Sequence, residues 1–344
     1  MGASRKEGRD KILDGYRGVA VLGVVLGHAI AYRFGAQLGG MSEFQPLLRL
    51  AQPLSDLGVK LFFVISGYII TALLLREEAA AGRVNIRAFY SRRMFRILPP
   101  FFAYLVTLWL ARWSGWIDIA NSQLIASASF TCNLDIVECV WWTAHTWTLA
   151  VEEQYYLLWP PLLTMLPTRL RSVFLTLVTG ALLATFVMMP FEFHSNYSAF
   201  PCIAVGAFYA TSTRAQQWVA RHSHGGVWLL VTAAIVIGYS SAAIKLADLF
   251  APIAIIYIIF SAYRIAWLRS LLEGRLLQVA GSVSYSLYLW QQLFLARPDT
   301  YNGAPPLWAL PIVVAAAVIL IERPSIKLGK RVSVALSRPI LTTA

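Results

Sequence analysis

Three polar residues lie in the first apolar stretch of the chain, Leu13 to Ala29: Asp14, Arg17 and His28. If this stretch is helical, at about 100° per residue, Arg17 and His28 share one face and Asp14 lies within about 60° of both. At about 1.5 Å per residue, His28 lies roughly 16 Å from Arg17, about half the thickness of a bilayer core. Ionisable groups are costly at that depth, so the spacing indicates a functional site. A neutral histidine bonded to a neighbouring helix is the structural alternative.

Three arginines end the most basic segment of the chain, Arg76 to Arg96. Arg92 and Arg96 are spaced i,i+4, and Arg93 and Arg96 are spaced i,i+3, so their guanidinium groups converge on a helix. Because arginine donates two parallel hydrogen bonds to phosphate oxygens, such a cluster could bind a polyphosphate. Topological signals and contacts with lipid headgroups are the alternative explanation for these charges.

Two adjacent carboxylates, Glu152 and Glu153, lie inside another apolar run. Since adjacent side chains point in different directions and charge is costly in a bilayer, we expect Glu152 to face inward, with Tyr155 on the same side, and Glu153 to be structural or exposed to water. Ser66 lies in the middle of a third run. A small residue there indicates close helix packing, with a substrate passage as the second interpretation.

The elements that must position these residues are long apolar helices. The chain is 58% hydrophobic and only 13% charged, which is far from the composition of a soluble domain of this length. We predict an all-α, polytopic integral membrane protein with about ten transmembrane helices. The basic first residues are followed by a run that contains Arg17 and His28, which favours a retained first helix over a signal peptide. The predicted spans are 16–35, 54–75, 97–113, 148–166, 172–190, 197–211, 226–244, 246–263, 276–296 and 307–322.

The net charge of +12 follows the loops between these runs. With the N-terminus inside, 23 of the 29 Lys and Arg lie at inner segments and five at outer ones. The positive-inside rule therefore predicts cytoplasmic N- and C-termini and an even number of spans in a cytoplasmic (inner) membrane. It also explains the excess of basic residues, so we expect no nucleic-acid partner.

The chain lacks an internal repeat or a low-complexity linker, so we predict one domain over residues 1–344, with a core at 11–325 and cytoplasmic tails at 1–10 and 326–344. Cys132 and Cys139 lie in the longest outer segment, where they either form a disulfide or remain two thiols. Cys202 lies in an apolar run and is expected to be buried. No metal site is expected.

Six motifs follow one another along the chain: LDGYRG, with ten residues between Arg17 and His28, then Gly58 to Gly67, Arg92 to Pro99, Trp147 to Pro160, Ser284 to Gln291, and Glu322 to Pro324. This ordered set resembles the membrane-bound acyltransferase family 3, which includes bacterial O-antigen and exopolysaccharide O-acetylases. The similarity runs almost end to end. Three positions depart from the family's usual residues: the family often has an acidic residue where Lys60 lies, Arg where Ala199 lies, and His where Gln291 lies.

This resemblance implies transfer of an acyl group, most often acetyl, from cytoplasmic acyl-CoA to a hydroxyl of a cell-surface sugar, polysaccharide or glycolipid. Acyl-CoA is then a co-substrate, no cofactor is bound permanently, and the bilayer and polysaccharide-assembly proteins are the other expected partners. We expect His28 to act as general base on the acceptor hydroxyl. The other expected site residues are Asp14, Arg17 and Glu152 at the catalytic centre, Arg92, Arg93 and Arg96 at the CoA phosphates, and Ser66, Tyr155 and Tyr156 at the substrate.

Three alternatives stay open from the residues. A covalent acyl-histidine intermediate would use the same His28. A transporter is the alternative from another class, because polytopic chains with intramembrane Arg, His and Glu often move solutes. A degenerate acyltransferase could serve as a structural partner in polysaccharide assembly, although the intact Arg17 and His28 argue against it.

Overall fold

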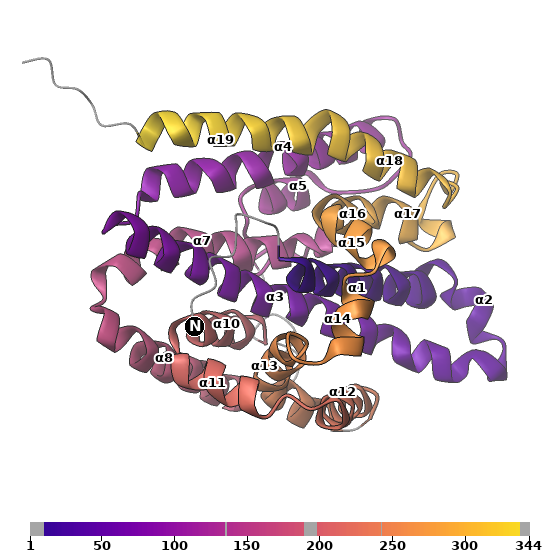
Figure 1. Ribbon diagram of the computed structural model, residues 1–344. Helices are drawn as coiled ribbons and strands as arrows, with labels where there is room; N and C mark the ends of the chain where they lie inside the picture. The colour runs from indigo at the N-terminus through magenta and orange to yellow at the C-terminus, as the bar shows by residue number, and fades with distance from the viewer. Residues whose placement is uncertain (1–9, 135, 189–197, 242, 338–344) are drawn as a thin grey trace, which may run out of the picture. The chain divides into compact units, whose positions relative to one another are not determined.

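The computed structural model describes residues 10–134, 136–188, 198–241 and 243–337, and within these ranges it is built from helices, as Figure 1 shows. Contacts between Cα atoms divide the chain into two compact units. Unit 1 comprises Met1–Gly27, Ser42–Ile69 and Phe174–Ser284, and unit 2 comprises His28–Met41, Ile70–Val173 and Tyr285–Ala344. Each unit is described by itself.

Unit 1 contains most of the first long helix, the first part of the second, and residues 174–284. It includes the 3-10 turn η2, Ser42–Phe44. Helices α1, α3, α8 and α16 belong to it only in part, since the division falls inside them. The helices among its described residues are α1 Lys11–His28, α3 Gln45–Ala81, α8 Thr168–Met188, α10 Ala199–Thr211, α11 Thr213–Arg221, α12 Gly225–Tyr239, α13 Ile244–Ser261, α14 Ala266–Leu272, α15 Arg275–Ser282 and α16 Ser284–Trp290.

Glycines let the helices of unit 1 approach closely. A Cβ atom at Gly281 of α15 would collide with the backbone carbonyl of Asp14 on α1. At the contact of α3 with α10, a Cβ at Gly67 would lie 2.9 Å from the Ile203 carbonyl carbon, and one at Gly206 would lie 2.9 Å from the Tyr68 nitrogen. These distances are too short for any side chain, so small residues set the helix spacing, as is common in membrane bundles. The stretch that contains Ser66 therefore packs closely.

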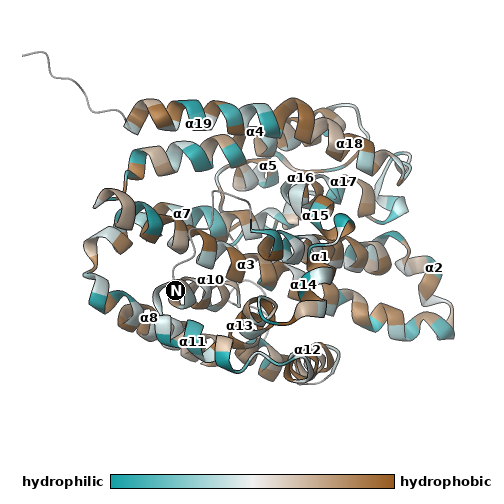
Figure 2. Cartoon of the chain, in the orientation of Figure 1, coloured by the Kyte–Doolittle hydropathy of each residue, from teal (hydrophilic) through white to brown (hydrophobic). Residues whose placement is uncertain are grey.

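A buried ion pair joins α3 to α13 in unit 1. The Lys60 Nζ lies 3.0 Å from the Asp248 Oδ1, and less than a tenth of either side chain is exposed. The Tyr239 hydroxyl donates to the same carboxylate, and its ring lies 5.0 Å from the Lys60 ammonium. Lys60, a departure from the family pattern, is thus matched by a partner. Figure 2 shows the surrounding α12 as almost uniformly hydrophobic.

Unit 2 contains two π-helical turns, η1 at Ala29–Arg33 and η5 at Val318–Glu322, and the 3-10 turn η4 at Pro298–Thr300. It also includes the last residues of α3 and α16 and the first of α8. Its own helices are α2 Gly35–Gly39, α4 Ile86–Trp113, α5 Asn121–Ala128, α6 Trp141–Ala144, α7 Thr146–Met165, α17 Gln292–Leu295, α18 Ala309–Ala317 and α19 Arg323–Ser337.

The C-terminal helix α19 lies along α4, as Figure 1 shows at the top of the view. Gly329 permits this contact, because a Cβ there would lie 2.6 Å from the Phe95 Cβ. The Asn85 side chain donates to the Leu336 carbonyl at 3.2 Å. Residues 326–337 of the predicted C-terminal tail thus form part of a packed helix, and residues 338–344 lie outside the described range.

Among the described residues, six helical segments are long and apolar enough to cross a membrane, so the chain is a multi-pass membrane protein. Two shorter apolar helices, α10 and α12, match two further predicted runs. The total of about ten spans stays a prediction, as do the positions of the termini and the single domain. The six segments are Lys11–Arg33, Ser42–Ala81, Ile86–Trp113, Thr168–Met188, Ile244–Ser261 and Ala309–Ser337.

The predicted span 276–296 is not one continuous helix. It is divided into α15, α16 and α17, with breaks at Val283 and Gln291. At the first break the Ser282 hydroxyl donates to the Val279 carbonyl at 2.7 Å, a local bond that competes with helix continuation. Hydropathy alone could not reveal these breaks, because the run stays apolar on both sides of them.

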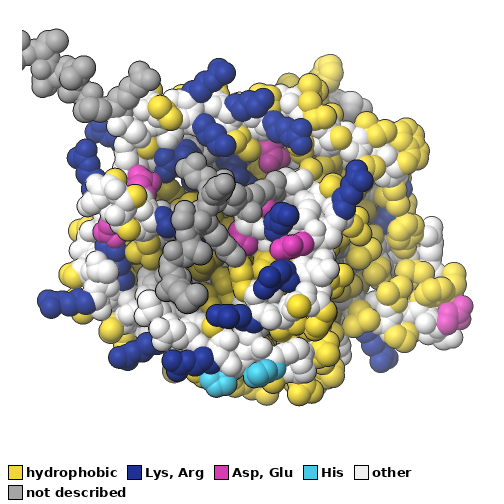
Figure 3. All heavy atoms as spheres, in the orientation of Figure 1, with side chains coloured by type: hydrophobic (Ala, Val, Ile, Leu, Met, Phe, Trp, Pro, Cys, Tyr) yellow, Lys and Arg dark blue, Asp and Glu magenta, His cyan; other side chains and the backbone are white. Residues whose placement is uncertain are grey.

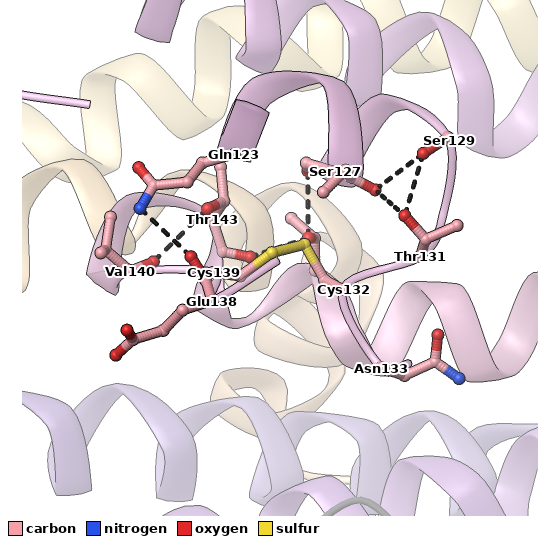
Figure 4. Close-up of a disulfide and its surroundings, with 12 residues drawn as sticks. Gln123, Ser127, Ser129, Thr131, Cys132, Asn133, Glu138, Cys139, Val140 and Thr143 are labelled. Atoms are coloured by element: carbon pink, nitrogen blue, oxygen red, sulfur yellow. Dashed lines mark hydrogen bonds between the residues drawn. A yellow bond between two sulfur atoms is a disulfide. The ribbon is translucent and has the colours of Figure 1, made fainter. Parts of the chain in front are cut away.

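Cys132 and Cys139 form a disulfide, the first of the two alternatives, with their Cα atoms 5.8 Å apart. Figure 4 shows the bridge closing the loop between α5 and α6. Beside it the Gln123 amide of α5 donates to the Glu138 carbonyl at 3.1 Å. Cys202 is a buried free cysteine, as expected.

Candidate functional site

His28 is the last residue of α1 and directly precedes the π-helical turn η1. In that turn the Phe34 N–H donates to the Ala29 carbonyl, five residues earlier, at 2.9 Å. A π turn adds one residue to a helical repeat and so changes the direction of the side chains that follow, and such turns are frequent at functional sites. The local fold at the candidate base therefore departs from a regular span.

The His28 imidazole is half-buried among polar and aromatic groups of unit 2. Its Nδ1 lies 3.0 Å from the Oε1 of Gln291, whose side chain is fully buried. The rings of Trp141 and Tyr32 meet the imidazole edge-on, with centroids 5.3 Å and 5.9 Å away. One ring nitrogen of His28 is thus committed to a hydrogen bond, and aromatic contacts orient the ring.

A chain of amides continues behind this contact. The Gln291 Nε2 donates to the Gln292 Oε1 at 2.8 Å, and the Gln292 Nε2 donates to the Trp141 carbonyl at 2.7 Å. The Trp141 indole N–H in turn donates to the Gln292 carbonyl at 2.9 Å. From the sequence, Gln291 is only a departure from the family pattern, and neither Gln292 nor Trp141 is among the predicted site residues. Two consecutive glutamines in an apolar run were the available signal.

A second candidate site is a basic cavity of about 440 Å³ in unit 2. It brings together all three predicted phosphate ligands, Arg92, Arg93 and Arg96, and adds Lys330 from α19. Figure 3 shows Lys and Arg side chains gathered over the region where Figure 1 places α19 and α4. Four cations around one concave surface favour an anionic ligand. The remaining lining residues are Leu73, Glu77, Phe89 and Ile326.

Two of the arginines are held in place by the surrounding protein. Arg92 forms an ion pair with Glu77 at 3.0 Å and donates to the Ser333 hydroxyl at 2.8 Å. The Arg93 guanidinium lies over the rings of Tyr156 and Phe89, 5.5 Å and 5.8 Å from their centroids. These ion-pair and cation–π contacts order the side chains before a ligand arrives, which reduces the entropic cost of binding. Tyr156 thus lies beside the arginine cluster.

The other predicted site residues lie in both units. In unit 2, Glu152 and Tyr155 lie on α7, and the Tyr155 hydroxyl is 3.1 Å from the Thr71 hydroxyl, which also accepts from the Trp159 indole at 2.8 Å. In unit 1, Asp14 is buried on α1, Arg17 is half-buried on the same helix, and Ser66 lies on α3. The roles assigned to these residues stay predictions.

Comparison with known proteins agrees with the motifs. A family described as an acyltransferase domain matches residues 10–321. O-acetyltransferase OatA of Staphylococcus aureus strain NCTC 8325 is 25% identical over an alignment of 361 positions, gaps included, which covers 90% of this chain and 55% of the relative. The putative O-acetyltransferase SACOL0978 of S. aureus strain COL is 25% identical over an alignment of 365 positions with the same coverage. The chain thus spans about half the length of these curated relatives, and no solved structure matches it significantly.

Proposed function

We propose, on the premise that this chain belongs to the acyltransferase domain family, that it moves an acyl group from cytoplasmic acyl-CoA to a hydroxyl of a cell-surface sugar, polysaccharide or glycolipid. The printed names of the relatives, O-acetyltransferases, favour acetyl as the group and oxygen as the acceptor atom. The observation that carries the donor assignment is the basic cavity, because an acyl-CoA bears its phosphates at one end of a long arm and its thioester at the other.

In the proposed reaction, Arg92, Arg93 and Arg96 bind the phosphates and the pantetheine arm extends toward His28. The His28 imidazole takes the proton of the acceptor hydroxyl, whose oxygen attacks the thioester carbonyl carbon. The C–O ester bond forms, the C–S bond breaks, and the proton passes from His28 to the departing thiolate. Attack by His28 itself, through an acyl-imidazole, is the rival mechanism.

The first test is mass spectrometry of surface glycans from cells that carry the wild type, His28→Ala, the matched control His222→Ala, or no copy of the gene. His222 is an exposed histidine at the end of α11 and is far along the chain from the site. An ester mass is expected with the wild type and the control. His28→Ala should lose it, because removing a general base lowers turnover about 10²- to 10⁴-fold.

Membrane levels of each variant are measured by immunoblot in the same cells. Identical glycans in all four strains, with the protein present in the three that carry the gene, would contradict acyl transfer to surface glycans. A small-molecule acceptor would then be tested first and solute transport second. Protection of the arginines from chemical modification by a non-hydrolysable acyl-CoA analogue separates these two outcomes, since transport predicts no protection.

A further inference from the structure

We propose that Gln291 and Gln292 act as positioning residues that hold His28 in one tautomer, with the proton on Nδ1 and the lone pair on Nε2. This inference deepens the proposed function, because it names the atom that would accept the substrate proton, and it rests on His28 being the base. It follows from which groups along the amide chain can donate a hydrogen bond and which can only accept one.

The amide chain is anchored at the backbone of Trp141. A peptide carbonyl can only accept a hydrogen bond, so the Gln292 side chain must turn its NH₂ group toward it, at 2.7 Å. The reverse orientation would place two carbonyl oxygens against each other. The reciprocal bond from the Trp141 indole to the Gln292 carbonyl holds the two residues in register. The Gln292 Oε1 must therefore face away from Trp141.

That oxygen fixes the orientation of the next amide. The Gln292 Oε1 can only accept, so Gln291 must present its NH₂ group there, at 2.8 Å. The Gln291 Oε1 then faces the imidazole, 3.0 Å from the His28 Nδ1. Both glutamine side chains are at most 2% exposed, so water has little access to compete for these bonds.

An amide oxygen requires a donor opposite it. If His28 carried its proton on Nε2, the Nδ1 lone pair would point at the Gln291 oxygen lone pairs, which is repulsive and leaves a buried acceptor without a partner. The proton therefore lies on Nδ1. In neutral imidazole the other nitrogen then holds the lone pair, and only that nitrogen can take a proton from a hydroxyl.

The amide chain also suits the imidazolium form of His28, which arises when Nε2 takes the proton. Protonation of Nε2 leaves the Nδ1–H bond to Gln291 unchanged, so no side chain has to rotate when the proton arrives. The Gln291 carbonyl dipole points its negative end at the new imidazolium and stabilises it. Hydrogen bonds from the second nitrogen of a functional histidine commonly set its tautomer in this way.

The tautomer can be measured without any assay of activity. The full chain, labelled with ¹⁵N-histidine and reconstituted in lipid, contains five histidines, and His28→Ala identifies the His28 signals by subtraction. At a pH where His28 is neutral, the wild type is expected to show the ¹⁵N shift of a protonated Nδ1 and an unprotonated Nε2. A proton on Nε2 in the wild type would overturn the proposal.

Variants then test the role of each amide. Gln291→Leu and Gln292→Leu are expected to give a mixture of tautomers. Gln291→Glu, measured with its carboxyl protonated, should retain the wild-type tautomer, because its O–H donates to the Gln292 Oε1 and its other oxygen still accepts from Nδ1. The control is Gln216→Leu, which removes an amide that bonds the Tyr209 carbonyl on α10, away from His28 in the sequence. An unchanged His28 spectrum in both leucine variants would also overturn the proposal.

Kinetics separate positioning from support of the fold. Gln291→Leu is expected to lower kcat about 10- to 100-fold with KM for acyl-CoA unchanged, and Gln291→Glu to restore most of it. Equal losses in both variants would indicate a structural role and contradict the proposal. If the wild type shows the expected tautomer and yet transfers no acyl group, the proposed function fails while the tautomer assignment stands.

Discussion

Lys60 and Asp248 form a pair of buried charges, and removing one of them should cost more stability than removing both. Taking away one partner leaves the other desolvated and uncompensated, which typically costs about 3–5 kcal/mol. We therefore expect Lys60→Met to lower the free energy of unfolding by that amount. The double variant Lys60→Met/Asp248→Asn should recover much of the loss, because the asparagine is neutral and still accepts from the Tyr239 hydroxyl.

These values can be measured by unfolding the detergent-solubilised protein with SDS. Lys245→Met serves as the matched control, since it removes an exposed lysine of α13 and should change stability little. If Lys60→Met and Lys245→Met had equal effects, the pair would not contribute as described. A double variant less stable than Lys60→Met would equally count against the desolvation argument.

Candidate site residues were predictable from the sequence where the residue type and the helical spacing alone identify them. His28 is recognisable as a polar group within an apolar run. The i,i+3 and i,i+4 spacing predicts that Arg92, Arg93 and Arg96 converge, and all three line one cavity. The partners Asp248, for Lys60, and Gln291, for His28, were not predictable. Each lies far away along the chain, and only the packing of helices brings it into contact.

At the scale of elements, helix α19 adds to the basic cavity a cation that lies beyond the residues matched by the acyltransferase family, which end at 321. We expect Lys330→Gln to raise KM for acyl-CoA about 2- to 10-fold without changing kcat, the loss of one partly exposed contact to phosphate of about 0.5–1.5 kcal/mol. The measurement is steady-state acyl transfer by the reconstituted protein at low ionic strength, where such contacts are screened least.

Lys327→Gln is the matched control, since it removes an exposed charge from the same helix without touching the cavity. Equal changes in KM for the two variants would point to the general charge of α19 rather than to a contact at Lys330. A fall in kcat alone would contradict a role in donor binding.

Elements were predicted well where hydropathy decides and poorly where local bonds or packing decide. Six of the expected apolar runs coincide with helices long enough to span a membrane. The run 276–296 has the right composition but is divided at Val283 and Gln291. The second of these breaks places Gln291 beside His28, so the deviation from a regular helix contributes directly to the candidate site.

At the scale of the molecule, the contacts within unit 2 are those expected if the loops are divided between two sides as the charge pattern predicts, whichever side is cytoplasmic. Among segments assigned to the inner side, Glu78 is paired with Arg171, and Asn85 donates to Leu336. Among those assigned to the outer side, Ile117 and Tyr301 form an antiparallel bridge. Segments far apart in the sequence thus meet others of the same predicted side, which the counting of Lys and Arg did not use.

We therefore predict that both termini are cytoplasmic and that the 297–306 loop is external. The test is labelling of single cysteines introduced into the full chain at Ser4, Asn302 and Thr343, with a membrane-impermeant maleimide applied to spheroplasts. Labelling of the native cysteines is expected to be low, because Cys132 and Cys139 form a disulfide and Cys202 is buried. Asn302→Cys should react in intact spheroplasts, whereas Ser4→Cys and Thr343→Cys should react only after the spheroplasts are permeabilised. If only one terminus reacted from outside, the number of spans would have to be odd. If both termini reacted from outside, the whole orientation would be reversed, and the basic cavity would lie on the side away from cytoplasmic acyl-CoA.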